Sequence, residues 1–268
     1  MKHTPLDSQD HYLGPVMHSL NQFKEFSAVL TLVVAVVAGW IPFRQHLKTL
    51  KGKEFPRSEA LASGVFLGAG LIHMLSGASS EFEKLNVHYP FAFLLAGFSF
   101  LSLLLLEHYA SEVKHHETIS SPAIATLAVI MLSVHSLFAG AALGLSNSIT
   151  TSLLILVAII AHKWAASFSL AVQLNKSRQP IKRQLVYFAI FAVMTPIGIL
   201  LGEQVANISN HHNYIEPIFT SLAAGTFLYI GTLHGLKRSV MIERCCNLRD
   251  FSYVIAGFSL MAIVAIWT

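Results

Sequence analysis

Four histidines lie inside long apolar segments of the chain: His73, His135, His162 and His234. Neutral imidazole is a common ligand of zinc, copper, nickel and iron, whereas magnesium, calcium and manganese prefer oxygen ligands. Two of these histidines end the same pattern, G-x-F-L-x-x-G-x-x-H, which occurs at residues 64–73 and again at 225–234. A single histidine of this kind could be incidental, but two in the same frame indicate a duplicated element.

The other two histidines share a second pattern. HSLFAGAALG from His135 and HKWAASFSLA from His162 both follow H-x-x-x-A-[GS]-x-x-L-[GA]. Small residues recur three to five positions apart in both segments, and such residues allow membrane helices to approach closely. If the two helices cross at these residues, His135 and His162 face one another, and His73 and His234 join them through the first repeat. We therefore predict a site for a divalent transition metal built from these four histidines.

The composition indicates which elements must position this site. Of 268 residues, 54% are hydrophobic and 12% are charged, whereas a soluble domain carries about 25% charged residues. A helix that crosses a bilayer needs about 20 mostly apolar residues. The uncharged stretches are 27–43, 60–80, 85–106, 119–162, 184–202, 217–236 and 251–268.

The stretch at 119–162 is long enough for two helices and contains a polar turn, SNSITTS, at residues 146–152. The sequence therefore predicts an all-α integral membrane protein with eight transmembrane helices. It divides into a polar N-terminal tail at residues 1–26 and a single transmembrane domain at residues 27–268. Most of the chain then lies within the lipid bilayer.

Basic residues predict the orientation of these helices. With the N-terminus outside, most of the 18 lysines and arginines fall in connections that face the cytoplasm, in agreement with the positive-inside rule. Both termini are then extracytoplasmic, and the compact length favours a bacterial inner membrane. The net charge of +4 does not indicate a nucleic-acid partner, because the basic residues are divided among short loops rather than gathered on one face.

In this orientation the second and seventh helices run in opposite directions, as do the fourth and fifth. We predict an inverted repeat of helices 1–3 against helices 6–8, with helices 4 and 5 in the centre. Inverted repeats are typical of secondary transporters, whose sites lie near the middle of the membrane. The chain contains no HExxH motif, which argues against a metalloenzyme, and we expect no enzymatic activity.

Three further ionisable residues fall within or at the end of the predicted spans: Glu107, Lys163 and Glu203. Such residues tend to face the bundle interior and to mark a pathway or site. Lys163 either pairs with Glu107 or Glu203 or extends its ammonium group toward the membrane surface. The histidines also have a structural alternative, as residues bonded to a carbonyl or a serine.

A series of segments appears in a specific order: SGVFLGAGLIHML, HSLFAGAALGLS, AHKWAASFSLAVQL, TPIGILLG and AAGTFLYIGTLHGL. The series resembles the ZIP (Zrt/Irt-like) family of divalent metal transporters over nearly the whole chain after the N-terminal tail. The resemblance implies an eight-helix bundle that imports zinc, iron or a similar ion as substrate, with no resident cofactor. His135 and His162 match the family histidines of the fourth and fifth helices, Lys163 matches an HK variant, and His73 matches a histidine of some branches.

The departures from the family pattern concern carboxylates. Where many relatives carry acidic residues this chain has Gly77, Ala139 and Ala166, and His234 replaces a frequent glutamate. A carboxylate offsets the charge of a cation in a low dielectric, so the site needs another source of compensation. Within the predicted spans the candidates for charge compensation are Glu107, Glu203 and Lys163.

Two functions remain open at this stage. The first is transport of a divalent transition metal, zinc before others, toward the cytoplasm by alternating access. The second is a ZIP-like protein that has lost transport and acts as a metal sensor or a membrane scaffold. The sequence leaves homodimer formation open.

Overall fold

The computed structural model describes residues 10–48, 56–113, 122–177, 179–206, 214–233 and 248–267. These residues are almost entirely helical, and no strand occurs among them. The elements are α1 (Asp10–Lys48), α2 (Pro56–Gly68), the π-helical segment η1 (Ala69–Met74), α3 (Leu75–Lys84), α4 (Phe91–Val113), α5 (Pro122–Leu145), α6 (Ile149–Lys176), α7 (Ile181–Val205), α8 (Ile215–Tyr229) and α9 (Leu248–Val264). Because α2, η1 and α3 are continuous, the described elements form eight rods, as the sequence predicted.

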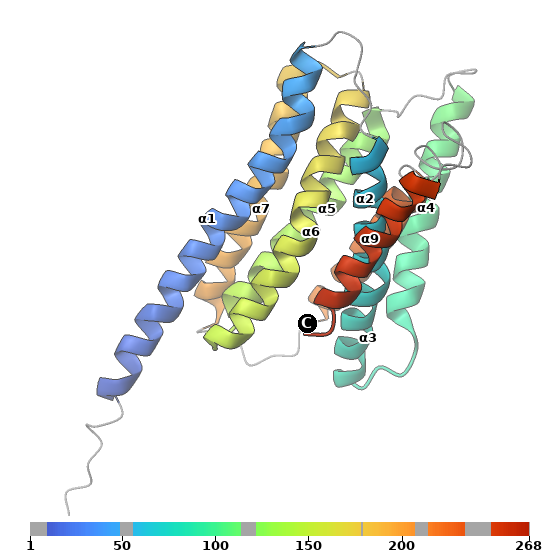
Figure 1. Ribbon diagram of the computed structural model, residues 1–268. Coiled ribbons are helices and arrows are strands. Elements are labelled where there is room, and N and C mark those ends of the chain that lie inside the picture. Colours follow the sequence, from blue (N-terminus) through green and yellow to red (C-terminus); the bar gives the residue numbers. More distant parts are fainter. Residues whose placement is uncertain are drawn as a thin grey trace, which may run out of the picture.

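The rods lie side by side, and successive rods run in opposite directions (Figure 1). The chain enters α1 and leaves α9 at the same end of the bundle, which is also the end where α3 stops and α6 begins. We call this the lower end, as it is drawn in Figure 1.

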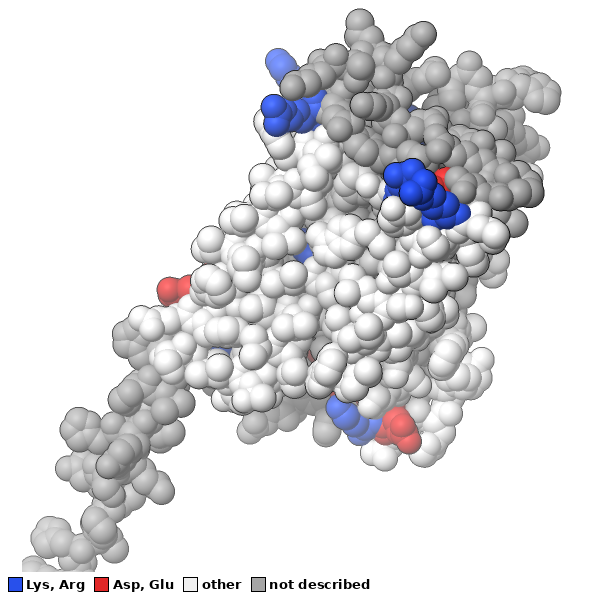
Figure 2. Space-filling model, viewed as in Figure 1, with Lys and Arg blue, Asp and Glu red and all other residues white. Residues whose placement is uncertain are grey.

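The surface of the bundle fits a bilayer. Six of the described rods are long and apolar enough to cross a membrane, and α8 and α9 have 15 and 17 residues within the described ranges. Large apolar side chains such as Val37, Phe98 and Leu105 are exposed on the outer faces of α1 and α4. Figure 2 shows Lys, Arg, Asp and Glu mainly at the two ends of the visible face, with a broad band of other residues between them. The protein is therefore a multi-pass membrane protein.

A break between the two central helices is confirmed, but it covers only residues 146–148 of the expected 146–152, because residues 149–152 form the first turn of α6. Helix α5 ends at Leu145 and α6 begins at Ile149. Ser148 caps α6, because its hydroxyl oxygen accepts a hydrogen bond from the backbone N–H of Thr151 at 3.4 Å, and serine is among the preferred residues at this position. The two central helices are thus joined by a short turn at the lower end.

The packing agrees with the predicted inverted repeat. The most extensive contacts pair α1 with α6, α5 with α7, α2 with α9 and α4 with α8. In the predicted repeat, α1 corresponds to α7, α2–α3 to α8, α4 to α9, and α5 to α6. The α1–α6 pair is therefore equivalent to the α7–α5 pair. The α2–α9 pair likewise maps onto α8–α4. The bundle is therefore made of two helix groups, α1, α5, α6 and α7 on one side and α2–α3, α4, α8 and α9 on the other.

The repeat extends to a local distortion of the helices. Residues 230–233, after α8, are π-helical like η1, and Ala69 and Ile230 occupy the same position in the G-x-F-L-x-x-G-x-x-H pattern. Single π-helical turns within α-helices occur frequently at functional sites. In the first copy this turn carries His73.

Glycine determines how closely α5 and α7 pack. A Cβ atom on Gly140 would lie 2.2 Å from the carbonyl oxygen of Thr195, and one on Gly198 would lie 2.1 Å from that of Leu137. No side chain fits between these backbones. This contact holds Thr195 of α7 against the helix that carries His135.

Candidate metal site

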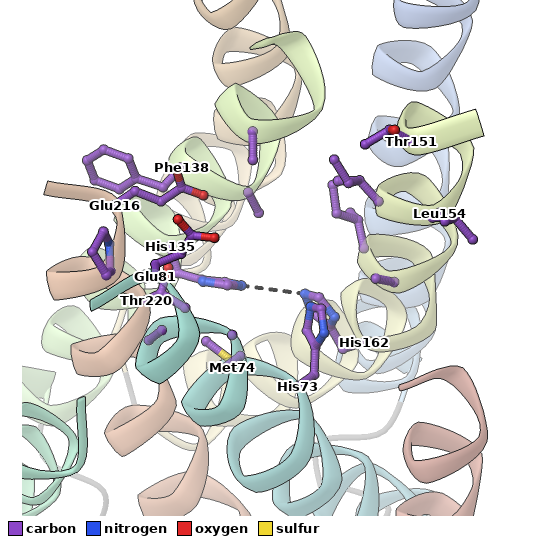
Figure 3. Close-up of a pocket in the computed structure, with 18 of the residues that line it drawn as sticks. His73, Met74, Glu81, His135, Phe138, Thr151, Leu154, His162, Glu216 and Thr220 are labelled. Carbon is purple, nitrogen blue, oxygen red and sulfur yellow. Dashed lines mark hydrogen bonds between the residues drawn. The ribbon is translucent and has the colours of Figure 1, made fainter. Parts of the chain in front are cut away.

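The centre of the site is a pair of histidines from the two central helices. His135 of α5 and His162 of α6 are both buried, and their Nε2 atoms lie 3.5 Å apart (Figure 3). The interpretation of the H-x-x-x-A-[GS]-x-x-L-[GA] repeat as two helices with facing histidines agrees with this geometry.

A third predicted histidine lies beside the pair. His73, half-buried on η1, has its ring centroid 6.0 Å from that of His162. Phe227 of α8 covers the pair, with ring centroids 5.5 Å from His135 and 5.9 Å from His162. The structure therefore brings together three of the four histidines, from both helix groups. His234 lies outside the described residues.

A cavity of about 350 Å³ leads to the histidines, and we call it the outer cavity. Its wall follows α5 from His135 to Ala142 and α6 from His162 to Thr151, which are the parts of these helices nearest the lower end. The other polar or sulfur-bearing side chains of the wall are those of His73, Met74, Glu81, Glu216 and Thr220. The histidine pair thus lies at the inner end of a cavity that extends toward one end of the bundle.

A second, much smaller cavity lies beyond the pair, and we call it the inner void. Its volume is about 10 Å³, and Ser136, Lys163, Ala166 and Thr195 are among its lining residues. The buried ammonium group of Lys163 donates hydrogen bonds of 3.0 Å to the hydroxyl oxygens of Ser136 and Thr195. The same group lies 3.9 Å from the centroid of the Phe191 ring, a cation–π contact. Lysine therefore places a cationic group on this side of the histidines.

The acids expected to compensate charge are elsewhere. Glu107 of α4 accepts a hydrogen bond of 2.6 Å from the hydroxyl group of Tyr229, so it links α4 to the end of α8. Glu203 lies in the last turn of α7, near enough to Lys24 for their charges to interact. Neither acid lines the outer cavity as far as the chain is described. The expected pairing of Lys163 with one of them is not formed among the described residues, because its ammonium group is bonded to hydroxyls instead.

Sequence reasoning missed the two acids that do line the cavity, Glu81 and Glu216. They immediately flank the uncharged stretches at 60–80 and 217–236. Because the predicted spans were ended at charged residues, both glutamates fell just outside them. Their position at the ends of two helices that also carry pattern histidines was the signal that could have identified them.

The donor set is incomplete for a bound ion in this conformation. Within the described ranges, no three side chains of His, Cys, Asp or Glu lie close enough together to hold a metal ion. Zinc in proteins usually takes four ligands. The histidine pair therefore provides two nitrogen donors, and any further ligands come from water or from side chains that move.

The apolar rods define a multi-pass membrane protein, and its internal cavity ends at two buried histidines. The chain belongs to the ZIP zinc transporter family, because residues 116–265, more than half of its length, match the model of that family. Members of this family are transporters rather than enzymes. The family predicted from the sequence motifs is thereby confirmed.

Individual relatives align over most of their own lengths. Zinc transporter ZIP2 of Mus musculus is 29% identical over 258 residues, which cover 77% of this chain and 83% of the relative. Zinc transporter ZIP1 of Takifugu rubripes is 27% identical over 300 residues, covering 93% and 99%. Zinc transporter 11 of Arabidopsis thaliana is 28% identical over 275 residues, covering 89% and 82%.

Proposed function

We propose that this chain moves a divalent transition metal, zinc before other ions, toward the cytoplasm by alternating access. The observation that carries the proposal is the 3.5 Å separation of the Nε2 atoms of His135 and His162 at the inner end of the outer cavity. Relatives with names that specify zinc transport support the choice of ion.

The spacing of the two nitrogens suits a shared ion. Zinc binds imidazole nitrogen at about 2.0–2.1 Å in tetrahedral sites, which places two such nitrogens about 3.3–3.4 Å apart. The observed pair needs almost no adjustment to reach this spacing. In the proposed mechanism His135 and His162 bind the ion as neutral imidazoles, and a small rotation of η1 brings His73 to it as a third ligand. His234 remains a proposed ligand because it ends the second copy of the G-x-F-L-x-x-G-x-x-H pattern.

The direction of transport rests on the orientation of the bundle. We propose that the lower end, and with it both termini, faces away from the cytoplasm, because the basic residues favour that orientation. The ion then enters through the outer cavity and leaves after the two helix groups have moved relative to one another. The relatives above come from eukaryotes, so a bacterial inner membrane gains no support from them.

The alternative, a metal sensor or scaffold without transport, is not favoured. It was motivated by alanine at positions 139 and 166, but the relatives named as zinc transporters align across most of the chain. Two facing imidazoles also remain available to an ion without those acids. A homodimer stays a prediction from the sequence.

Uptake into proteoliposomes tests the proposed function. Vesicles loaded with a metal-sensitive dye are exposed to zinc, iron(II), cobalt, nickel, copper and manganese in turn, with the wild type and the double variant His135→Ala/His162→Ala. We expect saturable zinc entry that the double variant abolishes. His88→Ala serves as the control, because His88 is exposed and does not line the cavity. Absence of entry for every ion, with folded protein in the vesicles, would refute transport.

A further inference from the structure

We propose that the ion pair between Glu59 and Lys176 is a latch that holds the exit path of the ion closed while the outer cavity is open. This inference rests on the proposed function and adds to it the residues that hold the two helix groups together beyond the histidines. Glu59 lies in the first turn of α2, and Lys176 is the last residue of α6. Both lie at the end of the bundle opposite the lower end (Figure 1), which we call the upper end.

The ion pair joins the two helix groups. The ammonium group of Lys176 donates hydrogen bonds of 3.1 and 3.2 Å to the two carboxylate oxygens of Glu59. Lys176 belongs to the group that contains α6, and Glu59 belongs to the group that contains α2. Within the described ranges, the other ion pair between rods is that of Arg57 with Asp250, which connects α2 to α9 and so stays inside one group. Separation of the groups at the upper end therefore requires the Glu59–Lys176 pair to break.

The latch and the histidine site are the two ends of one contact between rods. His162 of α6 lies beside His73 of η1, and Lys176 of α6 is bonded to Glu59 of α2. The interval from His162 to Lys176 equals that from Glu59 to His73, so α6 lies antiparallel along the continuous rod α2–η1 between these contacts. One face of α6 therefore leads from the histidine pair to the upper end.

A buried amide group on this face indicates that the contact opens. Gln173 lies about three turns of helix after His162 and about one turn before Lys176, so the helical period places it on the same face. Gln173 is 4% exposed, and neither polar atom of its side chain has a hydrogen-bond partner among the described residues. Because buried polar atoms are almost always paired, we infer a second conformation in which water reaches this face of α6.

The burial of the ion pair suits a contact that forms and breaks. The side chains of Lys176 and Glu59 are 28% and 14% exposed. A fully exposed pair contributes little to stability, whereas removal of one partner from a fully buried pair leaves an uncompensated charge at high cost. The Glu59–Lys176 pair lies between these limits. Its loss should therefore leave the fold intact and favour the conformation in which the remaining charge is in water.

The rate at which a maleimide modifies single cysteines along this face tests the latch. The background is purified, zinc-free protein with Cys245→Ser and Cys246→Ser. One reporter is Gln173→Cys, near the latch. The other is Ala166→Cys, which replaces a residue that lines the inner void. A path that opens from the upper end to the histidines exposes both reporters, whereas local loosening of the upper end exposes only the first.

We expect Glu59→Gln and Lys176→Gln each to raise both modification rates about tenfold. The double variant Glu59→Gln/Lys176→Gln should show rates no higher than either single variant, because the two charges act as one pair. Arg57→Gln is the matched control. It removes a charge from the same end of α2, but the ion pair that it breaks lies inside one helix group, so both rates should stay within about twofold of the background.

Four results would overturn the latch. They are unchanged rates at both reporters, a rise at Gln173→Cys without one at Ala166→Cys, an equal rise in Arg57→Gln, and a double variant in which the two single effects multiply. Modification is measured without zinc and without uptake, while the transport assay uses the native latch. Failure of the latch is therefore distinct from failure of the proposed transport function.

Discussion

The two sides of the histidine pair differ in both space and charge. Toward the lower end the outer cavity holds about 350 Å³ and carries two carboxylates. On the other side the inner void holds about 10 Å³, roughly enough for one water molecule, and carries the ammonium group of Lys163. We therefore expect a cation to reach the pair from the lower end and to find almost no space beyond it, so this conformation is open to an ion from one side only.

The contacts of Lys163 explain why the inner side is closed. Its ammonium group is bonded to Ser136 of α5 and Thr195 of α7, so one side chain of α6 joins three helices of the same group. Phe227, from the other group, covers the histidines. In the proposed alternating-access mechanism, we expect the two helix groups to separate at Phe227 before the ion moves onward.

The largest expected effect comes from adding a carboxylate to each side in turn. Ala139 lines both the outer cavity and the inner void. We expect Ala139→Glu to place an acid one turn after His135, where it joins the histidines as a ligand and tightens zinc binding by roughly 10- to 100-fold. Ala166→Glu places the acid beside Lys163, where the two charges neutralise one another and zinc affinity should stay within about twofold. Isothermal titration of the purified variants measures both values. Equal zinc affinities for the two variants would contradict the proposed difference between the two sides of the histidine pair.

A smaller effect is expected from removing the positive charge. Lys163 follows His162 in the chain, and its ammonium group is bonded to Ser136, which follows His135. Lys163→Met therefore removes a positive charge near both imidazoles and should tighten zinc binding by about 3- to 10-fold. Lys163→Arg keeps the charge and should leave the affinity close to that of the wild type. Weaker binding in Lys163→Met would mean that the lysine acts mainly by positioning α5, α6 and α7.

The smallest effect on transport is expected at Glu107, a carboxylate that lies apart from both cavities. Tyr229→Phe removes the hydroxyl group that donates to Glu107. Loss of a hydrogen bond to a charged group should lower stability by about 1–3 kcal/mol, seen as a lower melting temperature, with an unchanged KM for zinc. A raised KM in a variant of normal stability would instead place Glu107 on the ion pathway.

Much of the fold follows from the sequence because the bilayer imposes simple rules on it. Uncharged length predicted the rods, and SNSITTS predicted the turn between α5 and α6. The H-x-x-x-A-[GS]-x-x-L-[GA] pattern predicted that His135 and His162 face one another, because equivalent positions of a duplicated element pack in equivalent ways. A further repeat, AGFSF at residues 96–100 and AGFSL at 256–260, marks α4 and α9 as counterparts and could have been found in the same way.

The electrostatics of the site could not be obtained from the sequence alone. Charged residues inside the spans were counted as members of the site, but Glu107 and Glu203 face other partners, and Glu81 and Glu216 enter the cavity from helix ends. Which acid approaches a histidine depends on helix rotation and on the π-helical turn at η1, and neither can be read from residue spacing. The same holds for Lys163, whose hydroxyl partners come from two other helices.

The central claim is that His135 and His162 together bind the transported ion. X-ray absorption at the zinc edge of purified, zinc-loaded protein tests it most directly. We predict nitrogen ligands at about 2.0–2.1 Å with the outer-shell scattering of at least two imidazole rings, and loss of that scattering in His135→Ala/His162→Ala. A shell of oxygen ligands without imidazole scattering, or an unchanged spectrum in the double variant, would contradict the claim.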